Sequence, residues 1–185
     1  MPVWIAMLRG VNVGPHHRIK MDALRKLFES LKCQNPQTYV QSGNVIFRAR
    51  EKNSELLAGK IATAIERKFG FRSEVVLRAT AEMREVVKSN PFAARRDVEP
   101  GKLLVTFLAH EPEAEARATL ASMKAYPEEL HLNGRDLYIY FPNGAGKSRL
   151  PWASVEKWLK TPGTARNWNS VTKMLEMAEA MEING

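Results

Sequence analysis

Short apolar runs and helically spaced apolar residues alternate along the first 80 positions. The runs at 3–9, 38–41, 44–48 and 73–77 predict strands, and Ser42-Gly43 predicts a hairpin turn between the middle two. Helical spacing predicts one helix over 21–31 and a second that is capped by Ser54 and ended by Gly70. The order β-α-β-β-α-β is typical of a ferredoxin-like split βαβ unit, with two helices on one face of an antiparallel sheet.

The second half of the chain nearly repeats this order. The pattern predicts a strand over 103–109, a helix over 112–124, and strands at 130–132 and 137–141 joined by Asn133-Gly134. A helix is predicted from about Pro151 and a final one with Val171, Met174, Leu175, Ala178 and Met181 on its apolar face. Thr164 is expected to cap this last helix, so the second half reads as β-α-β-β-α plus a helix, without a last strand.

A short helix beginning at Thr80 and ended by Asn90-Pro91 connects the two halves. The turn-rich stretch that follows, up to Gly101, marks a boundary. The expected fold is therefore α+β with two packed subdomains. Residues 1–79 form the ferredoxin-like subdomain, 80–101 the connecting helix and linker, and 102–185 the second α+β subdomain with the C-terminal helix.

Charge is distributed unevenly along the 185 residues. The formal net charge is +8; residues 1–90 carry 16 Lys or Arg against 8 Asp or Glu, and residues 91–185 carry 12 of each. Such a field attracts anions without specifying which. The single Cys33 excludes an internal disulfide. No run of 18 apolar residues and no signal peptide is visible, so a cytoplasmic protein without a membrane partner is expected.

The segment 8–14 leads from the first strand through a glycine-containing loop into a helix. Glycines let backbone amides approach an anion, and a helix start adds partial positive charge. Arg9, Arg18 and Lys20 would supply full charges around Gly10, Asn12 and Gly14. The same residues could also serve only turn geometry and solvation.

Two further segments carry polar residues of interest, at 142–148 and at 164–171. The first ends in Gly-Lys-Ser, but Phe141 stands where a Walker A loop needs its first glycine, so a P-loop is excluded. Lys147 in that loop could still hold an anion. In the second segment Arg166, Asn167 and Asn169 offer many hydrogen-bond donors to a ligand, beside Trp168. The structural alternative is that these side chains join the start of a helix to the core by hydrogen bonds.

Neither metal nor cofactor is expected. The four His and one Cys show no ligand spacing of a zinc site, and no nucleophile elbow is present. The aromatic residues Trp4, Tyr39 and Phe47 on the first sheet match no RNA-binding motif, and a core role is expected for at least two of them.

Four segments together resemble a known family. They are Leu-Arg-Gly-x-Asn-Val-Gly at 8–14, Tyr-Val-Gln-Ser-Gly-Asn-Val at 39–45, Pro-Asn-Gly at 142–144 and Thr-Ala-Arg-Asn-Trp-Asn at 164–169. They resemble a widespread bacterial domain of unknown function, DUF1697, over nearly the whole chain. Pro15 departs from the second glycine common in that family. The resemblance implies no activity, substrate or cofactor.

The resemblance strengthens the hypothesis that the polar loop residues contact a ligand, against a purely structural role, because functional residues concentrate in loops. We expect an anionic ligand, phosphate-bearing or nucleic acid, to bind in a cationic cleft between the two halves. An enzyme acting on a small anionic metabolite and an interaction domain with structural motifs are the alternatives, and the oligomeric state is not predicted. The candidate ligand residues are Arg9, Gly10, Asn12, Gly14, Lys20, Gln41, Ser42, Asn44, Lys147, Arg166, Asn167 and Asn169.

Overall fold

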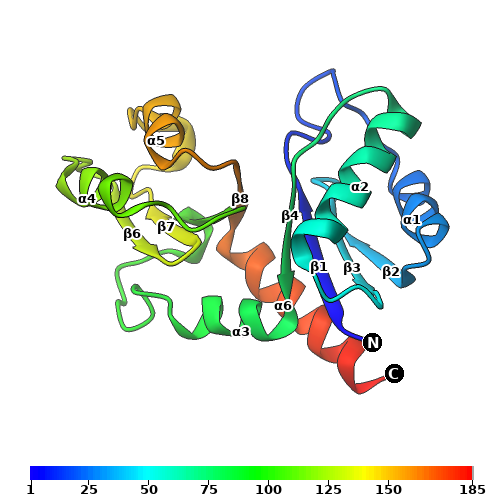
Figure 1. The fold of residues 1–185 in the computed structure, drawn as a ribbon. Coiled ribbons are helices and arrows are strands. Elements are labelled where there is room, and N and C mark those ends of the chain that lie inside the picture. The colour runs from blue at the N-terminus through cyan, green and yellow to red at the C-terminus, as the bar shows by residue number, and fades with distance from the viewer. Residues whose placement is uncertain (185) are drawn as a thin grey trace. The chain divides into compact units, whose positions relative to one another are not determined.

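A computed structural model describes residues 1–184 of the chain (Figure 1). Its first βαββαβ motif consists of β1 (Val3–Leu8), α1 (Met21–Ser30), β2 (Gln34–Tyr39), β3 (Asn44–Arg48), α2 (Ser54–Phe69) and β4 (Val75–Ala79). The strands form one antiparallel sheet in the order β2-β3-β1-β4. The predicted ferredoxin-like order of the first half is therefore confirmed.

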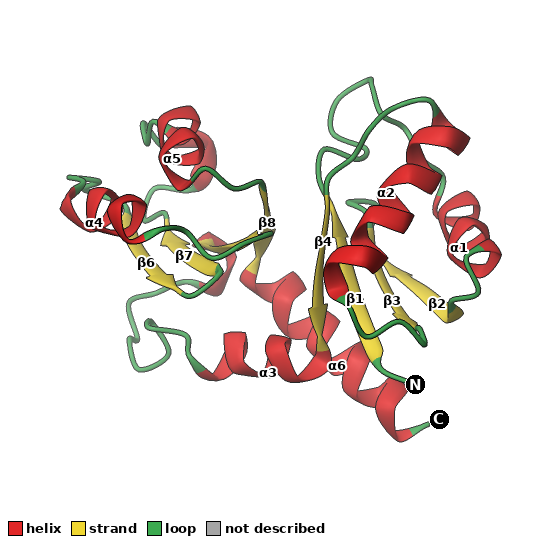
Figure 2. Cartoon of the chain, in the orientation of Figure 1, coloured by secondary structure: helices red, strands yellow, loops and turns green. Residues whose placement is uncertain are grey.

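Helices α1 and α2 pack together on one face of this sheet (Figure 2). The core beneath them is built from alternate strand residues and the apolar faces of both helices, including Trp4, Phe47, Leu24 and Ile61. Trp4 and Phe47 are buried, which confirms the core role expected for two of the aromatic residues. Because both rings are buried in the core beneath the helices, neither is available to stack on a base.

Two predicted helix caps differ from the structure. Asn53, not Ser54, caps α2, because its side-chain oxygen accepts from the Leu56 amide. Helix α3 (Thr80–Lys88) does begin at Thr80, but the Thr80 hydroxyl has no hydrogen-bond partner among the described residues. Instead Glu82 Oε2 accepts from the Ala79 amide at 2.7 Å. Sequence spacing locates a helix start within a residue but does not decide which polar side chain turns back to cap it.

The remaining elements follow the linker in chain order. They are the 3₁₀ turn η1 (Pro100–Lys102), β5 (Leu103–Leu108), α4 (Ala114–Ser122), β6 (Glu129–Asn133), β7 (Asp136–Tyr140), the 3₁₀ turn η2 (Ala145–Lys147), α5 (Trp152–Leu159), β8 (Gly163–Asn167) and α6 (Trp168–Ile183). The sheet is antiparallel in the order β6-β7-β5-β8. The β6–β7 hairpin at Asn133-Gly134 is confirmed.

The predicted absence of a last strand in the second half is wrong. β8 pairs with β5 from Leu104↔Asn167 to Leu108↔Gly163, so both halves are complete βαββαβ motifs. Thr164 therefore lies inside a strand and caps no helix. The segment Gly-Thr-Ala-Arg-Asn has no apolar alternation, and its first residue is instead fixed by close packing. A Cβ added at Gly163 would lie 2.9 Å from Leu108 Cδ2 and 3.1 Å from the Phe107 carbonyl oxygen.

The chain folds as two compact units. The first comprises Met1–Glu85 with the chain from Lys173 onward, and the second comprises Val86–Thr172. Both α3 and α6 therefore contribute to each unit. The predicted apolar face of the last helix is confirmed, since Val171, Met174, Leu175, Ala178 and Met181 are all buried. Within residues 1–184, no helix combines the length and apolar character that crossing a membrane requires.

Candidate functional site

Asn12 closes the first loop of the first unit. Its Nδ2 donates to the carbonyls of Ile19 at 3.0 Å and Gln41 at 2.7 Å, and its Oδ1 accepts from the Ile19 amide at 2.9 Å. It holds a positive φ of 58°, which Asn tolerates better than most residues. Its amide is thus committed to main-chain groups. Asn12 positions the 9–20 loop and joins it to the β2–β3 turn.

The β2–β3 turn is locked from the other side by Asn44. This fully buried side chain donates to the Tyr39 carbonyl at 3.1 Å and to Ser42 Oγ at 3.0 Å. Gly43 (φ 80°) approaches the first loop so closely that a Cβ there would lie 2.9 Å from Leu8 Cβ. Its carbonyl accepts from the Leu8 amide. The Ser42 and Asn44 side chains therefore bond within the turn, whereas Val40 and Gln41 lie exposed.

Arg9 and the two loop glycines lie at the start of the same loop. The Arg9 amide donates to the Glu74 carbonyl at 2.9 Å, and the Arg9 carbonyl accepts from Ser73 Oγ at 2.9 Å. Gly10 and Gly14 both have a φ of 69° and are exposed. The predicted residues of the first two motifs are thus brought together at one end of the first unit.

An open depression of about 520 Å³ lies between these loops and the start of α1. It is lined by Asn12, Gln41, Arg18 and Lys20, together with the first residues of the helix. Lys20 occupies the N-cap position and makes no side-chain capping bond. The first backbone amides of α1, which border the depression, therefore have no side-chain cap. Uncapped amides and the helix dipole give the N-terminal end of α1 a partial positive charge.

Asp22 is the acidic residue lining the depression. Its carboxylate pairs with Arg25, whose other guanidinium nitrogen donates to Thr38 Oγ1 at 2.6 Å. The ion pair offsets the negative charge of Asp22 beside Arg18 and Lys20. The depression thus presents two exposed cationic side chains and one carboxylate that already has a cationic partner.

Arg166 occupies a very different environment in the second unit. It is 8 % exposed, and its Nη1 donates to Thr164 Oγ1 and to the Ala165 carbonyl, both at 2.8 Å. Burial lowers the pKa of Arg166 to about 10, which leaves the guanidinium charged at neutral pH. Its Nη1 is therefore turned toward its own strand.

Arg78 is the counterpart of Arg166 in the first unit, and sequence reasoning missed it. Arg78 pairs with Ile5 across β4 and β1, as Arg166 pairs with Val105 across β8 and β5. Arg78 is 1 % exposed, and its Nη1 donates to the carbonyl of the preceding Leu77 at 3.0 Å. Aligning the two halves by their last strands would have revealed this pair, but β8 was not recognised. The two arginines therefore hold the same position in the two motifs.

Asn167 and Asn169 stand on either side of Trp168, the first residue of α6. Asn167 Nδ2 donates to the Gly101 carbonyl at 2.8 Å, and its Oδ1 accepts from the Asn169 amide at 3.0 Å. Asn167 thus caps the helix and ties it to η1. These bonds match the structural alternative, in which polar side chains cap the helix and join its start to the core by hydrogen bonds.

Lys147 lies exposed in η2, beside an open pocket of about 370 Å³ that Lys124 and Arg149 also line. The 142–151 loop lies over the sheet face to which Ala165 points. Neighbouring strand residues point to opposite faces, so Arg166 points away from this loop. Lys147 and Arg166 are therefore on opposite sides of the second sheet. The expectation that residues of both halves form one cleft stays a prediction.

No group of three or more His, Cys, Asp or Glu side chains within residues 1–184 is arranged to hold a metal ion. The donors gathered around the first-unit depression are amides, guanidinium and ammonium groups, which suit an anion.

Comparison with known proteins gives a family and a fold. No curated protein matches the chain. The chain is similar in structure to a conserved bacterial protein, SP0830 from Streptococcus pneumoniae, with a TM-score of 0.71 at 20 % identity over 97 % of this chain and 99 % of that one. That likeness concerns the fold. A model of the family described as "Protein of unknown function (DUF1697)" matches residues 1–138, which include the first two of the four polar segments, so the chain belongs to this family, as the resemblance indicated.

Proposed function

We propose that the first unit binds a phosphate-bearing anion in the depression between the 9–20 loop, the β2–β3 turn and α1. The observation that carries this proposal is the N-terminus of α1, which has no side-chain cap and opens between Arg18 and Lys20. Helix amides and adjacent cations together form a common anion-binding arrangement. The two loops are preorganised around it by Asn12, so little ordering is needed when a ligand arrives.

The size of the depression suits this ligand. Its volume of about 520 Å³ falls within the range of small-molecule sites. The long Arg18 and Lys20 side chains are exposed and can converge on one phosphate group. The lining residues supply donors and positive charge, so the proposed function is binding.

The test is titration with inorganic pyrophosphate, followed by amide NMR of the protein. Amide shifts are expected at Met21 and Asp22 and in the 9–20 loop. Lys20→Met should weaken binding by about tenfold or more, because a hydrogen bond to a charged group is worth about 1.5–3 kcal/mol. Lys26→Met is the matched control, since Lys26 is an exposed lysine of the same helix outside the depression. Equal losses in both variants, or no shift at Met21, would refute the site.

A salt titration distinguishes a small phosphorylated ligand from a nucleic acid backbone. A small ligand should show a shallow dependence of affinity on salt, because few counterions are released. A single-stranded oligonucleotide that binds more tightly than pyrophosphate, with a slope reflecting several phosphates, would assign the anion to nucleic acid.

A further inference from the structure

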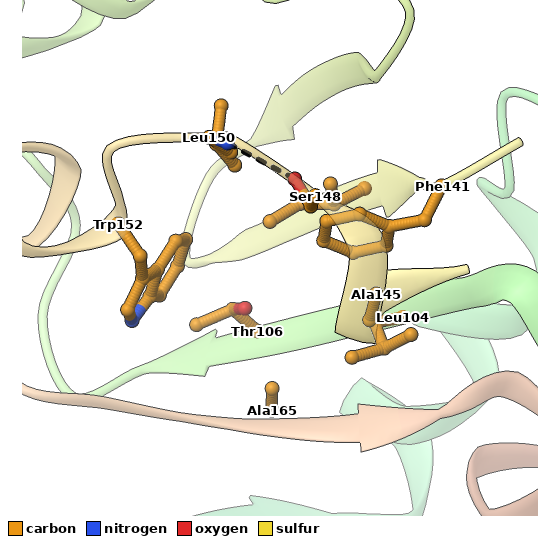
Figure 3. A pocket seen from close by; sticks show the side chains of 9 residues that line it. Leu104, Thr106, Phe141, Ala145, Ser148, Leu150, Trp152 and Ala165 are labelled. Atoms are coloured by element: carbon orange, nitrogen blue, oxygen red, sulfur yellow. Dashed lines mark hydrogen bonds between the residues drawn. The ribbon is translucent and has the colours of Figure 1, made fainter. Parts of the chain in front are cut away.

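A second, mostly apolar pocket belongs to the second unit and shares no lining residue with the proposed anion site. It has a volume of about 270 Å³ and opens between one face of the sheet and the 142–151 loop. Figure 3 shows Leu104, Thr106 and Ala165 forming its floor, with Phe141, Leu150 and Trp152 around it. The pocket was not anticipated from the sequence, because its floor includes β8.

The corresponding space in the first unit is filled by larger side chains. Register identifies the equivalent positions: Trp4 pairs with Phe47 in the first sheet, and Leu104 pairs with Ile139 in the second. Leu104 and Ile139 thus stand where the first unit has two buried aromatic rings.

The third floor position repeats this difference. Ala6 pairs with Leu77 in the first sheet, and Thr106 pairs with Ala165 in the second. Leu77 is buried in the first core, whereas Ala165 lines the pocket. The second unit therefore keeps the backbone of the motif and has smaller side chains at three neighbouring positions. Thr106 is larger than its counterpart Ala6, but this increase is small beside the loss of two aromatic rings and a leucine side chain.

One polar atom lies on this floor. Thr106, which replaces the Ala6 of the first unit, is 1 % exposed, and its hydroxyl has no hydrogen-bond partner within residues 1–184. Figure 3 shows its side chain at the floor of the pocket. The nearby Ser148 hydroxyl accepts from the Leu150 amide at 3.0 Å. A buried polar group without a partner is costly, so a ligand group that reaches this hydroxyl and pairs with it would remove that cost.

We propose that this pocket binds a small aromatic molecule with one hydrogen-bonding group, which pairs with the Thr106 hydroxyl. An apolar cavity of about 150 Å³ accepts benzene, so 270 Å³ accommodates a molecule of one or two rings. Phe141 and Trp152 offer aromatic surfaces against which a ring packs. The proposal does not depend on anion binding by the first unit.

The first test compares p-cresol with toluene, which differ by a hydroxyl group, in an amide NMR titration of the full chain. Both should shift resonances at Thr106 and Ala165, and p-cresol should bind about two- to tenfold more tightly, as one net hydrogen bond provides. Thr106→Val keeps the shape of the side chain and removes its hydroxyl. It should abolish the preference for p-cresol while toluene still binds. Absence of binding, or an unchanged preference in Thr106→Val, would overturn the proposal.

The second test refills the pocket. Ala165→Leu restores the residue type that the first unit has at Leu77 and should reduce the affinity for p-cresol by more than tenfold. Ala153→Leu is the matched control, because Ala153 is exposed on α5 and does not line the pocket. Undiminished binding in Ala165→Leu would place the ligand elsewhere. If that variant does not fold, the toluene comparison in Thr106→Val decides the question alone.

Discussion

Arg78 and Arg166 occupy equivalent positions in the two sheets and make the same bond to the carbonyl of the preceding residue. Each is almost completely buried on the last strand of its motif. A buried arginine whose donors serve neighbouring main chain stabilises the fold more than it serves a ligand.

Replacing either arginine by methionine keeps most of the side-chain volume and removes its donors. Arg166→Met leaves Thr164 Oγ1 and the Ala165 carbonyl without this donor and should lower the free energy of unfolding by about 1–3 kcal/mol. Arg78→Met should have a similar effect. Urea denaturation measures both, and the exposed Arg18→Met should change stability by less than about 0.5 kcal/mol. An unchanged free energy of unfolding in Arg166→Met would contradict the stabilising role and favour a ligand contact for Arg166.

Cys33 is a second residue whose environment determines its chemistry. It is 5 % exposed, and burial raises the pKa of its thiol to about 11 from an ordinary value of 9.0. The folded state therefore retains a proton that the unfolded state releases between pH 9 and pH 11. Stability contributed by this group is complete below pH 9 and decreases as pH rises through that window.

The corresponding measurement is thiol reactivity. At pH 8 the folded protein should react with a disulfide reagent roughly a hundredfold more slowly than unfolded protein, because about two pKa units separate their thiolate fractions. Cys33→Ala should remove the decrease of stability between pH 9 and pH 11 that is due to this thiol. Rapid reaction of the folded protein would show that the thiol is accessible.

At the level of elements, the pattern predicted the order of strands and helices in the first unit and all but one of these elements in the second. It placed the second strand at 38–41, whereas β2 is Gln34–Tyr39, a segment without apolar alternation. Their apolar residues repeat at periods that packing imposes, as Leu57, Ile61 and Ile65 do along α2. β8 lacks this apolar periodicity, because other contacts determine its residues. Gly163 has no room for a side chain, and its neighbours Ala165 and Arg166 serve a pocket and a buried hydrogen-bond cluster.

Two glycine substitutions should therefore have opposite effects. Gly163→Ala places a Cβ against Leu108 Cδ2 and the Phe107 carbonyl and should lower stability by about 1–3 kcal/mol through overpacking. Gly59→Ala lies within α2 with nothing within 4 Å of the added methyl and should raise stability by about 0.5–1 kcal/mol. Thermal unfolding of both variants checks the pair. A neutral Gly163→Ala would mean that β8 can move away from β5.

Across the whole molecule, the sequence located polar loops but not their roles. The meeting of Asn12 with Gln41 follows from the loop positions at one end of a split βαβ sheet. The side-chain amides of Asn12 and Asn44 bond to main-chain carbonyls and so hold the loops in place. That role depends on backbone conformations, such as the positive φ of Asn12, which the periodicity of the sequence does not encode. The apolar pocket was inaccessible to sequence reasoning because it is a difference between two aligned motifs, and the alignment required β8.

The excess positive charge of residues 1–90 gives the last prediction, which depends on the anion site. Arg67 and Lys68 are exposed in the last turn of α2 and do not line the depression. Neutralising both to Gln should weaken pyrophosphate binding about threefold at low salt, through the long-range field, and leave it unchanged near 0.5 M salt.

Lys20→Met should behave differently, because a direct contact persists when the field is screened. Its loss of affinity is expected at both salt concentrations, measured by the same NMR-monitored pyrophosphate titration. Lys157→Gln, an exposed lysine of the second unit, tests whether net charge alone matters. If all three variants lose affinity equally at low salt and none does at high salt, the attraction belongs to the overall charge, and the depression has no specific anion site.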